Sequence, residues 1–226
     1  MKKCFVMVLL CCLLVAGTAF AKTGTLLVAF GTSMDSARPA IDDIEKAYKK
    51  AAGNEPVLLA FTSDIIRNKL AKEGKPVLSV NAAMNELAAT DLKIQSLHIA
   101  PAEEYNQLER MVVKNITKNP GVFKTVKVGY PLLVSEKDLD AVVKVVLASL
   151  PKDRKPGDAV VLMGHGNDRG PGDLTLAATA AAFHKADPHV WLATVEGSNS
   201  FDNVLPKLKA SGAKRVWLQP FMIVAG

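Results

Sequence analysis

The chain has 226 residues, 49% of them hydrophobic and 22% charged, and its 28 lysines and arginines against 22 acidic residues give a formal net charge of +6. The basic residues are spread along the chain, and a mild, dispersed excess does not indicate binding to nucleic acid. We therefore expect no nucleic-acid partner. The length suits one large or two small α/β units.

Residues 1–21 have the features of a secretory signal peptide. Lys2 and Lys3 precede an apolar stretch over residues 4–15, and residues 19–21 (Ala-Phe-Ala) form a typical cleavage site. A membrane anchor is the alternative, but the apolar stretch is short for a bilayer span. No later segment is long and apolar enough to cross a membrane, so we expect no span after cleavage.

The three cysteines, Cys4, Cys11 and Cys12, all lie within this expected signal peptide. The exported chain would then have no disulfide framework and no thiolate metal site. Any transition metal would have to be bound by His, Asp, Glu or a bound cofactor.

Strands and helices are predicted to alternate along a first half, residues 22–150. Short apolar runs are typical of buried parallel strands, and polar caps, prolines and glycines mark the helix ends. The predicted strands are residues 25–30, 56–61, 91–100 and 122–128, and the predicted helices are residues 39–52, 65–73, 79–89, 103–118 and 135–150.

A polar, proline-containing linker at residues 151–157 predicts a domain boundary before a second half, residues 151–226. Its predicted strands are residues 159–163, 189–195 and 215–224, and its predicted helices are residues 174–186 and 203–211. The order of elements suggests one plan used twice, which aligns Phe30 with His165. We predict an α/β fold of two similar three-layer halves with mostly parallel sheets. The second half ends after its third strand, so we expect a truncated C-terminus.

Gly164-His165-Gly166 follows the apolar run at residues 159–163 and therefore lies where a predicted parallel strand ends. Ligands of α/β sheets bind at this edge. The two glycines leave the imidazole open and allow a flat, bulky group to approach the backbone. Histidine is both a common metal ligand and a base at neutral pH. The alternative is a histidine satisfied by hydrogen bonds within its loop.

Three further residues are candidates for the same chemistry. Glu196 ends the next predicted strand, and one histidine nitrogen with one carboxylate oxygen begins a site for a divalent metal. Its alternative is a loop glutamate that makes a cap or a surface pair. Glu104 lies at a predicted helix start, where the helix dipole also favours acids. His98 is either a structural strand histidine or a ligand of a metal or haem.

Common motifs for nucleotide binding and for a nucleophilic serine are missing from the sequence. Residues 164–170 do not fit the spacing G-x-G-x-x-G, and neither a Walker loop nor a G-x-S-x-G elbow occurs. The sequence therefore disfavours dinucleotide binding.

Five segments together resemble a known family, the sirohydrochlorin cobaltochelatases of the anaerobic pathway, which are class II tetrapyrrole chelatases. The segments are residues 27–33 with Arg38, residues 98–105, 163–166, 194–197 and 220–226. With its signal peptide, the chain is similar to the periplasmic branch of this family.

This resemblance implies ATP-independent insertion of Co²⁺, or of Fe²⁺, into a tetrapyrrole held in a cleft between the halves. It implies that His165 is the metal ligand or base, that Glu196 assists it, and that Glu104 faces the cleft. A second metal-binding histidine would fall about two residues past Gly226. The expected substrate contacts are Phe30, Gly31, Thr32, Gly164 and Gly166.

The resemblance also implies a periplasmic homo-oligomer, with a tetramer as one form, and haem b at a subunit interface with His98 as its candidate ligand. A tetrapyrrole with many carboxylates suits the positive charge balance. The alternative function is a non-catalytic periplasmic protein that binds or carries a metal, haem or a tetrapyrrole.

Overall fold

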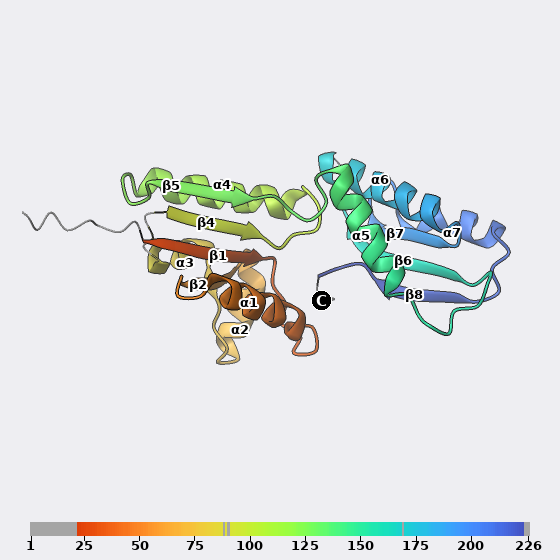
Figure 1. Ribbon diagram of the computed structural model, residues 1–226, viewed down its shortest axis with the longest axis horizontal. Coiled ribbons are helices and arrows are strands. Elements are labelled where there is room, and N and C mark those ends of the chain that lie inside the picture. The colour runs from red at the N-terminus through yellow and green to blue at the C-terminus, as the bar shows by residue number, and fades with distance from the viewer. Residues whose placement is uncertain (1–21, 88, 90, 169, 224–226) are drawn as a thin grey trace, which may run out of the picture.

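The computed structural model describes residues 22–87, 89, 91–168 and 170–223, and in them the chain forms two α/β units (Figure 1). The expected signal peptide at residues 1–21 and the expected continuation after Gly226 lie outside the described residues. None of the helices in this described part is long and apolar enough to span a membrane.

The first unit is a five-stranded parallel sheet in the order β3-β2-β1-β4-β5. The helices α1 and α2 cover one face, and α3 and α4 cover the other. Its elements are β1 (Thr23–Ala29), α1 (Arg38–Ala52), β2 (Val57–Phe61), α2 (Asp64–Lys72), β3 (Leu78–Ser79), α3 (Val80–Leu87), β4 (Asp91–Ser96), α4 (Glu103–Lys118) and β5 (Thr125–Gly129).

The central strand β1 explains this layering from its sequence. Leu26 and Val28 point into the core shared with α3 and α4, whereas Leu27 and Ala29 point into the core shared with α1 and α2. Both faces of a parallel strand are buried, so its apolar run is continuous rather than alternating.

The second unit is a three-stranded parallel sheet in the order β7-β6-β8. The helices α5 and α6 pack on one face through Val143 and Phe183, and α7 packs on the other through Val204 and Leu208. Its elements are α5 (Glu136–Ala148), β6 (Ala159–Gly166), α6 (Gly170–Ala186), β7 (Val190–Glu196), α7 (Phe201–Ala210) and β8 (Val216–Pro220).

The packing places α5 with the second sheet, one helix earlier than the boundary that the linker predicts. Val142 and Val143 of α5 share a core with Val160 and Leu162 of β6. The polar linker at residues 151–157 indicates an exposed connection, but its composition does not tell which sheet the preceding helix covers.

The carboxyl ends of β1, β4 and β8 lie toward the middle of the molecule (Figure 1). Contacts between the units in this region include the following two. Ala102, just before α4, lies against Gly172 at the start of α6, and Ile223, after β8, packs against the first-unit core that contains Leu27. The carboxyl edges of both sheets, where parallel sheets bind ligands, thus lie near each other in the middle of the molecule.

The structure confirms the predicted α/β class and shifts several boundaries. The strand β6 continues through His165 to Gly166, because Gly164 and Gly166 still pair with Thr194 and Glu196 of β7. The two-residue strand β3 was not expected from the sequence. The strands predicted to reach residues 100 and 224 end at Ser96 and Pro220.

Candidate metal centre

His165 and Glu196 lie side by side on neighbouring strands. Gly166 of β6 pairs with Glu196 of β7, so the side chain of His165 reaches the same edge. The distance from His165 Nε2 to Glu196 Oε1 is 3.4 Å, and the two side chains are 66% and 47% exposed. An imidazole and a carboxylate at the open carboxyl edge of a sheet provide two ligands, or one ligand and one base.

Glycine is required at two backbone positions around this pair. Gly166 has φ 95°, and a Cβ at this position would overlap the carbonyl oxygen of Glu196. Gly197 also has φ 95°, and a Cβ there would overlap the carbonyl oxygen of Asn167. Both positive φ angles and both close approaches exclude larger residues.

The loop after Glu196 is attached to α6 by a residue that the sequence did not single out. Asp173 Oδ1 accepts hydrogen bonds from the backbone N–H of Ser198 at 2.8 Å and from Ser198 Oγ at 3.0 Å. The only sequence signal is an acid in the first turn of a helix, which the helix dipole explains equally well. Nothing in the sequence connects it to Ser198, 25 residues away.

Glu104 lies in the first turn of α4 and is half-buried. It comes two residues after Ala102, which contacts Gly172 beside Asp173. The start of α4 thus lies at the start of α6. Among the residues that the structure describes, no third His, Cys, Asp or Glu completes a metal-binding cluster with His165 and Glu196.

The five expected substrate contacts differ in exposure. Phe30 is 45% exposed, whereas Gly31 is buried, has φ 107°, and would bring an added Cβ to 2.5 Å from the Phe61 ring. The side chain of Thr32 is also buried, and its Oγ1 accepts the Met34 N–H at 3.0 Å. Thr32 therefore stabilises the turn and offers no side-chain contact to a ligand.

The two glycines beside His165 also differ. Gly164 is buried, with Thr194 and the Phe221 carbonyl closest to an added Cβ, whereas Gly166 is partly exposed. Gly164 therefore supports the strand pairing, and a ligand would meet Gly166 first.

His98 does not fit as a haem ligand in this structure. It is 8% exposed, Nδ1 lies 2.8 Å from Ser96 Oγ, and Nε2 is buried without a hydrogen-bond partner. Burial lowers the pKa of His98 to about 4. Haem iron needs an imidazole nitrogen that faces open space, and neither nitrogen of His98 does so.

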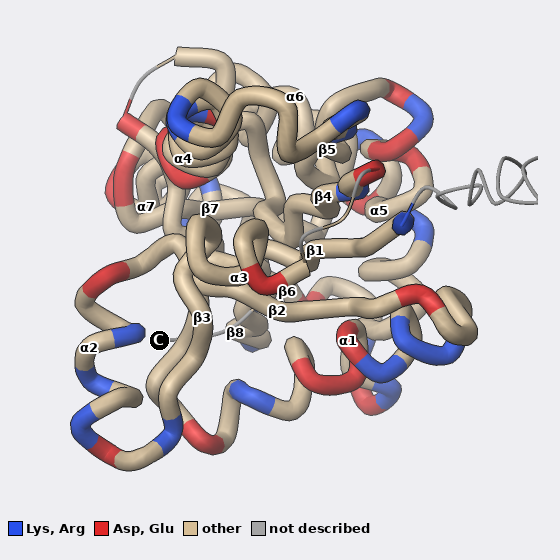
Figure 2. The backbone as a smooth tube through the Cα atoms, turned by 90° about the vertical axis from the view of Figure 1, so that its left-hand side faces the viewer, with Lys and Arg blue, Asp and Glu red and all other residues tan. Residues whose placement is uncertain are grey.

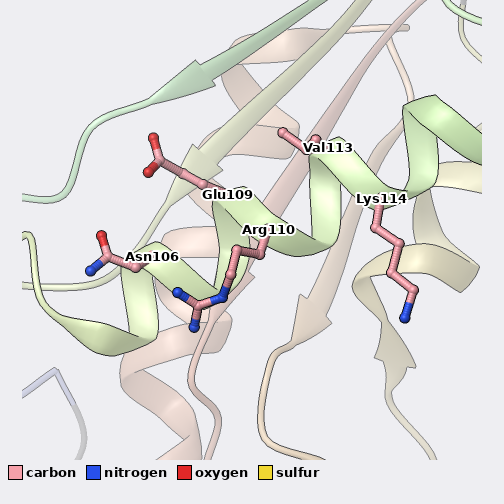
Figure 3. Close-up of a pocket in the computed structure, with 5 residues that line it drawn as sticks. All are labelled: Asn106, Glu109, Arg110, Val113 and Lys114. Atoms are coloured by element: carbon pink, nitrogen blue, oxygen red, sulfur yellow. The ribbon is translucent and has the colours of Figure 1, made fainter.

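Two hollows on the surface are lined by neither His165 nor Glu196. One, of about 440 Å³, follows the outer face of α4, where the side chains of Asn106, Glu109, Arg110, Val113 and Lys114 fan outward without converging (Figure 3). The other, of about 450 Å³, is an apolar groove between α5 and the segment after β8. Neither presents converging polar groups, so the strand edge is the better candidate.

The fold and the pair define a class: an α/β protein of two units, with a histidine and a carboxylate able to bind a divalent cation at a ligand-binding sheet edge. The cobalt chelatase (CbiK) family matches residues 23–226. The chain belongs to this family, and the protein is a metal chelatase enzyme.

Two curated relatives agree with this assignment. The chain is 38% identical over 208 residues to the sirohydrochlorin cobaltochelatase CbiKC of Nitratidesulfovibrio vulgaris, which covers 91% of this chain and 73% of that protein. It is 30% identical over 213 residues to the sirohydrochlorin cobaltochelatase of Salmonella typhimurium, covering 91% and 77%.

Two solved structures share the fold. SirB from Bacillus subtilis with Fe³⁺ superposes with a TM-score of 0.66 at 16% identity, over 91% of this chain and 78% of that one. The sirohydrochlorin chelatase SirB from Bacillus subtilis subspecies spizizenii in complex with cobalt superposes with a TM-score of 0.60 at 13% identity, over 91% and 76%.

Proposed function

We propose that this chelatase inserts Co²⁺ into sirohydrochlorin without ATP, and that His165 and Glu196 carry the metal and proton chemistry. The observation that supports this most directly is the 3.4 Å contact between His165 Nε2 and Glu196 Oε1 at an open strand edge. The chelatase relatives support the substrate, since both are named as sirohydrochlorin cobaltochelatases. Fe²⁺ is the second substrate metal in this proposal.

The reaction needs two kinds of group at the same place. One M²⁺ ion replaces two pyrrole N–H protons, so a ligand must deliver the metal and a base must accept protons. A neutral imidazole has one free lone pair and cannot do both at once. In this proposal His165 and Glu196 together capture the metal ion, and once the ion passes to the macrocycle the freed Glu196 carboxylate accepts one of the two pyrrole protons while the other passes to water.

The exposure of the pair supports a flat substrate that covers the two side chains when it binds. With 66% and 47% of their side chains exposed, His165 and Glu196 are open to a flat macrocycle approaching the sheet edge. Phe30, 45% exposed at the corresponding edge of the first unit, offers an aromatic contact to such a ring. No step needs a nucleotide, in keeping with a sequence that has no Walker-type loop.

The test follows insertion by absorbance after anaerobic mixing of the full chain with sirohydrochlorin and Co²⁺. We expect acceleration over the spontaneous reaction without any nucleotide, and loss of that acceleration in His165→Ala. His184→Ala is the matched control, because His184 of α6 packs against the Trp191 ring of β7 and plays no part in the proposed site. Wild-type protein without acceleration, or unchanged turnover in His165→Ala, would contradict the proposal.

The periplasm is the proposed location, supported by the charged and apolar N-terminal sequence and its Ala-x-Ala site. N-terminal sequencing of the protein from fractionated cells tests this. We expect a periplasmic protein that begins at Lys22, and a cytosolic protein that retains residues 1–21 would contradict the proposed export.

A further inference from the structure

Glu196 reaches its place beside His165 through a loop that is attached to a helix. Two residues after Glu196, the backbone N–H and the hydroxyl of Ser198 both donate to Oδ1 of Asp173. Asp173 lies in the first turn of α6, a helix of 17 residues. The loop then turns back, and the Thr194 N–H donates to the Asn199 carbonyl at 2.9 Å.

The space around Gly197 shows how closely this loop packs against Asp173. A Cβ on Gly197 would lie 2.6 Å from Asp173 Oδ1, and the carbonyl oxygen of Asn167 approaches even more closely. The backbone of Glu196 is therefore constrained on both sides. Glu196 itself pairs with Gly166 in the sheet, and Gly197 and Ser198, which follow it, lie against Asp173 of α6.

The other side of the same helical turn contacts the first unit. A Cβ on Gly172 would lie 2.8 Å from the Ala102 Cβ. The turn that carries Asp173 is thus packed between the loop after β7 and the start of α4. Because this turn of α6 is closely packed on both sides, it has little room to shift, and the Asp173 carboxylate therefore holds the loop in a fixed position.

From these contacts, we infer that Asp173 is a positioning residue that holds Glu196 at the distance from His165 needed for metal capture. The inference rests on the proposed function of the His165–Glu196 pair. Asp173 touches neither metal nor substrate. It acts through the two hydrogen bonds to Ser198, much as outer-shell partners orient metal-binding carboxylates elsewhere.

A purely structural role for Asp173 makes a different prediction. An acid in the first turn of a helix interacts favourably with the helix dipole through its charge. Asp173→Asn removes the charge but keeps an oxygen that can accept both hydrogen bonds from Ser198. Asp173→Ala removes both. A positioning role therefore predicts that Asn rescues the site, whereas a dipole role predicts that Asn and Ala lose the same stability and leave metal binding alone.

The experiment titrates the full chain with Co²⁺, followed by the visible absorption of the bound ion, and measures insertion turnover in parallel. We expect Asp173→Ala to weaken Co²⁺ affinity by ~10-fold or more, as is typical for outer-shell partners. Asp173→Asn should stay within about 3-fold of the wild type, well short of that loss. Asp202→Ala, an acid in the first turn of α7, is the matched control and should leave affinity unchanged.

A double-mutant cycle with Glu196→Ala shows whether Asp173 affects Co²⁺ affinity through Glu196 or through a general change in the fold. We expect Asp173→Ala to weaken Co²⁺ binding no further when Glu196 is absent, because Asp173 then has no carboxylate to position and the effects of coupled residues do not add. Independent, additive losses would overturn the inference. If Asp173→Ala does not fold, Ser198→Ala removes one of the two donors and should weaken Co²⁺ binding in the same direction, by less.

Two failures remain distinguishable. Wild-type protein that neither binds Co²⁺ nor inserts it would contradict the proposed function. Wild-type protein that inserts Co²⁺, together with an Asp173→Ala variant that binds it equally well, would overturn the positioning role of Asp173 and leave the proposed function standing.

Discussion

Burial separates two histidines that both follow apolar strand residues. His98, just after β4, is 8% exposed, and its Nε2 has no hydrogen-bond partner. His165, at the end of β6, has a side chain that is 66% exposed and lies beside a carboxylate. The same residue type is therefore a core group at one sheet edge and a candidate ligand at the other.

The buried His98 predicts a loss of stability in mild acid. Its pKa is about 4 in the folded chain and 6.5 in the unfolded chain, because burial disfavours the charged ring. As the pH falls through 6.5, the unfolded state binds a proton that the folded state does not. The free energy of unfolding should therefore fall by up to about 3 kcal/mol between pH 6.5 and 4.

Urea unfolding at pH 7 and pH 4.5 measures this difference. His98→Asn keeps a hydrogen-bonding group near Ser96 but does not titrate, so it should flatten the pH dependence. His184→Asn, on the surface, is the control. An identical pH slope in wild type and His98→Asn would show that His98 does not cause it.

Adding a single methyl group at Gly166, beside His165, is predicted to disrupt the site. In Gly166→Ala the Cβ would overlap the Glu196 carbonyl oxygen, and the φ of 95° is strained for any other residue. We expect a loss of stability of at least about 1 kcal/mol together with loss of Co²⁺ binding. Gly53→Ala carries only the strain, since Gly53 has φ 61° with open space around it.

Comparing the two variants isolates the clash. Gly53→Ala should lose about 1 kcal/mol of stability and keep Co²⁺ binding. Full Co²⁺ affinity in Gly166→Ala, measured by the same absorption titration, would mean that the end of β7 can move without harm to the site.

At the scale of elements, α6 connects the candidate site to the second core. Gly172 and Asp173 lie in the first turn of the helix, beside the site. The buried side of the helix continues through Leu176 and Thr179 to Phe183. The Phe183 ring is fully buried and meets Phe221, just after β8, edge to face at 5.7 Å between ring centres. The helix is thus held at both ends.

Truncating Phe183 tests how far this helix depends on its core contact. Phe183→Ala should lower the free energy of unfolding by about 3–5 kcal/mol, because the removed ring leaves a cavity in a packed interior. Leu174→Ala on the same helix, where Leu174 is 72% exposed, should change it by less than about 0.5 kcal/mol. Chemical denaturation measures both, and similar losses would contradict the packing described for α6.

At the scale of the whole molecule, the charge suggests how an anionic substrate arrives. The whole chain carries a formal net charge of +6, of which Lys2 and Lys3 in the proposed signal peptide contribute +2. Acidic and basic residues alternate on the helices and loops around α1 and α2, while the strands β1 and β2 are free of both (Figure 2). The field is therefore mild and spread over the surface rather than focused in one patch.

Such a field predicts a salt-dependent encounter with a polycarboxylate tetrapyrrole. Insertion at limiting tetrapyrrole should slow as salt rises from about 0.01 M to about 1 M, because the screening length falls from roughly 30 Å to roughly 3 Å. Turnover at saturating substrate should change little. Stopped-flow absorbance measures both rates, and a tetrapyrrole with esterified carboxylates is the control. Equal salt dependence for the acid and the ester would exclude electrostatic steering.

Particular residues show what sequence reasoning could reach. The apolar runs of β1 and β6 predict buried parallel strands, and the residues after such runs lie at a ligand-binding edge wherever the strands finally sit. Because neighbouring parallel strands end at the same edge, the sequence also predicts that His165 and Glu196 can meet. The pairing of Gly166 with Glu196 then sets them side by side.

By itself, then, the sequence determined the order of the strands and helices apart from the short β3, the α/β class and the approximate place of the His165–Glu196 pair, since these follow from local hydrophobic patterns. Only the tertiary structure decided that Thr32, Gly164 and His98 are buried, that α5 covers the second sheet, and that Asp173 holds Ser198. The physical reason is that burial and side-chain hydrogen bonds depend on which distant segments pack together, and local sequence carries no record of those neighbours.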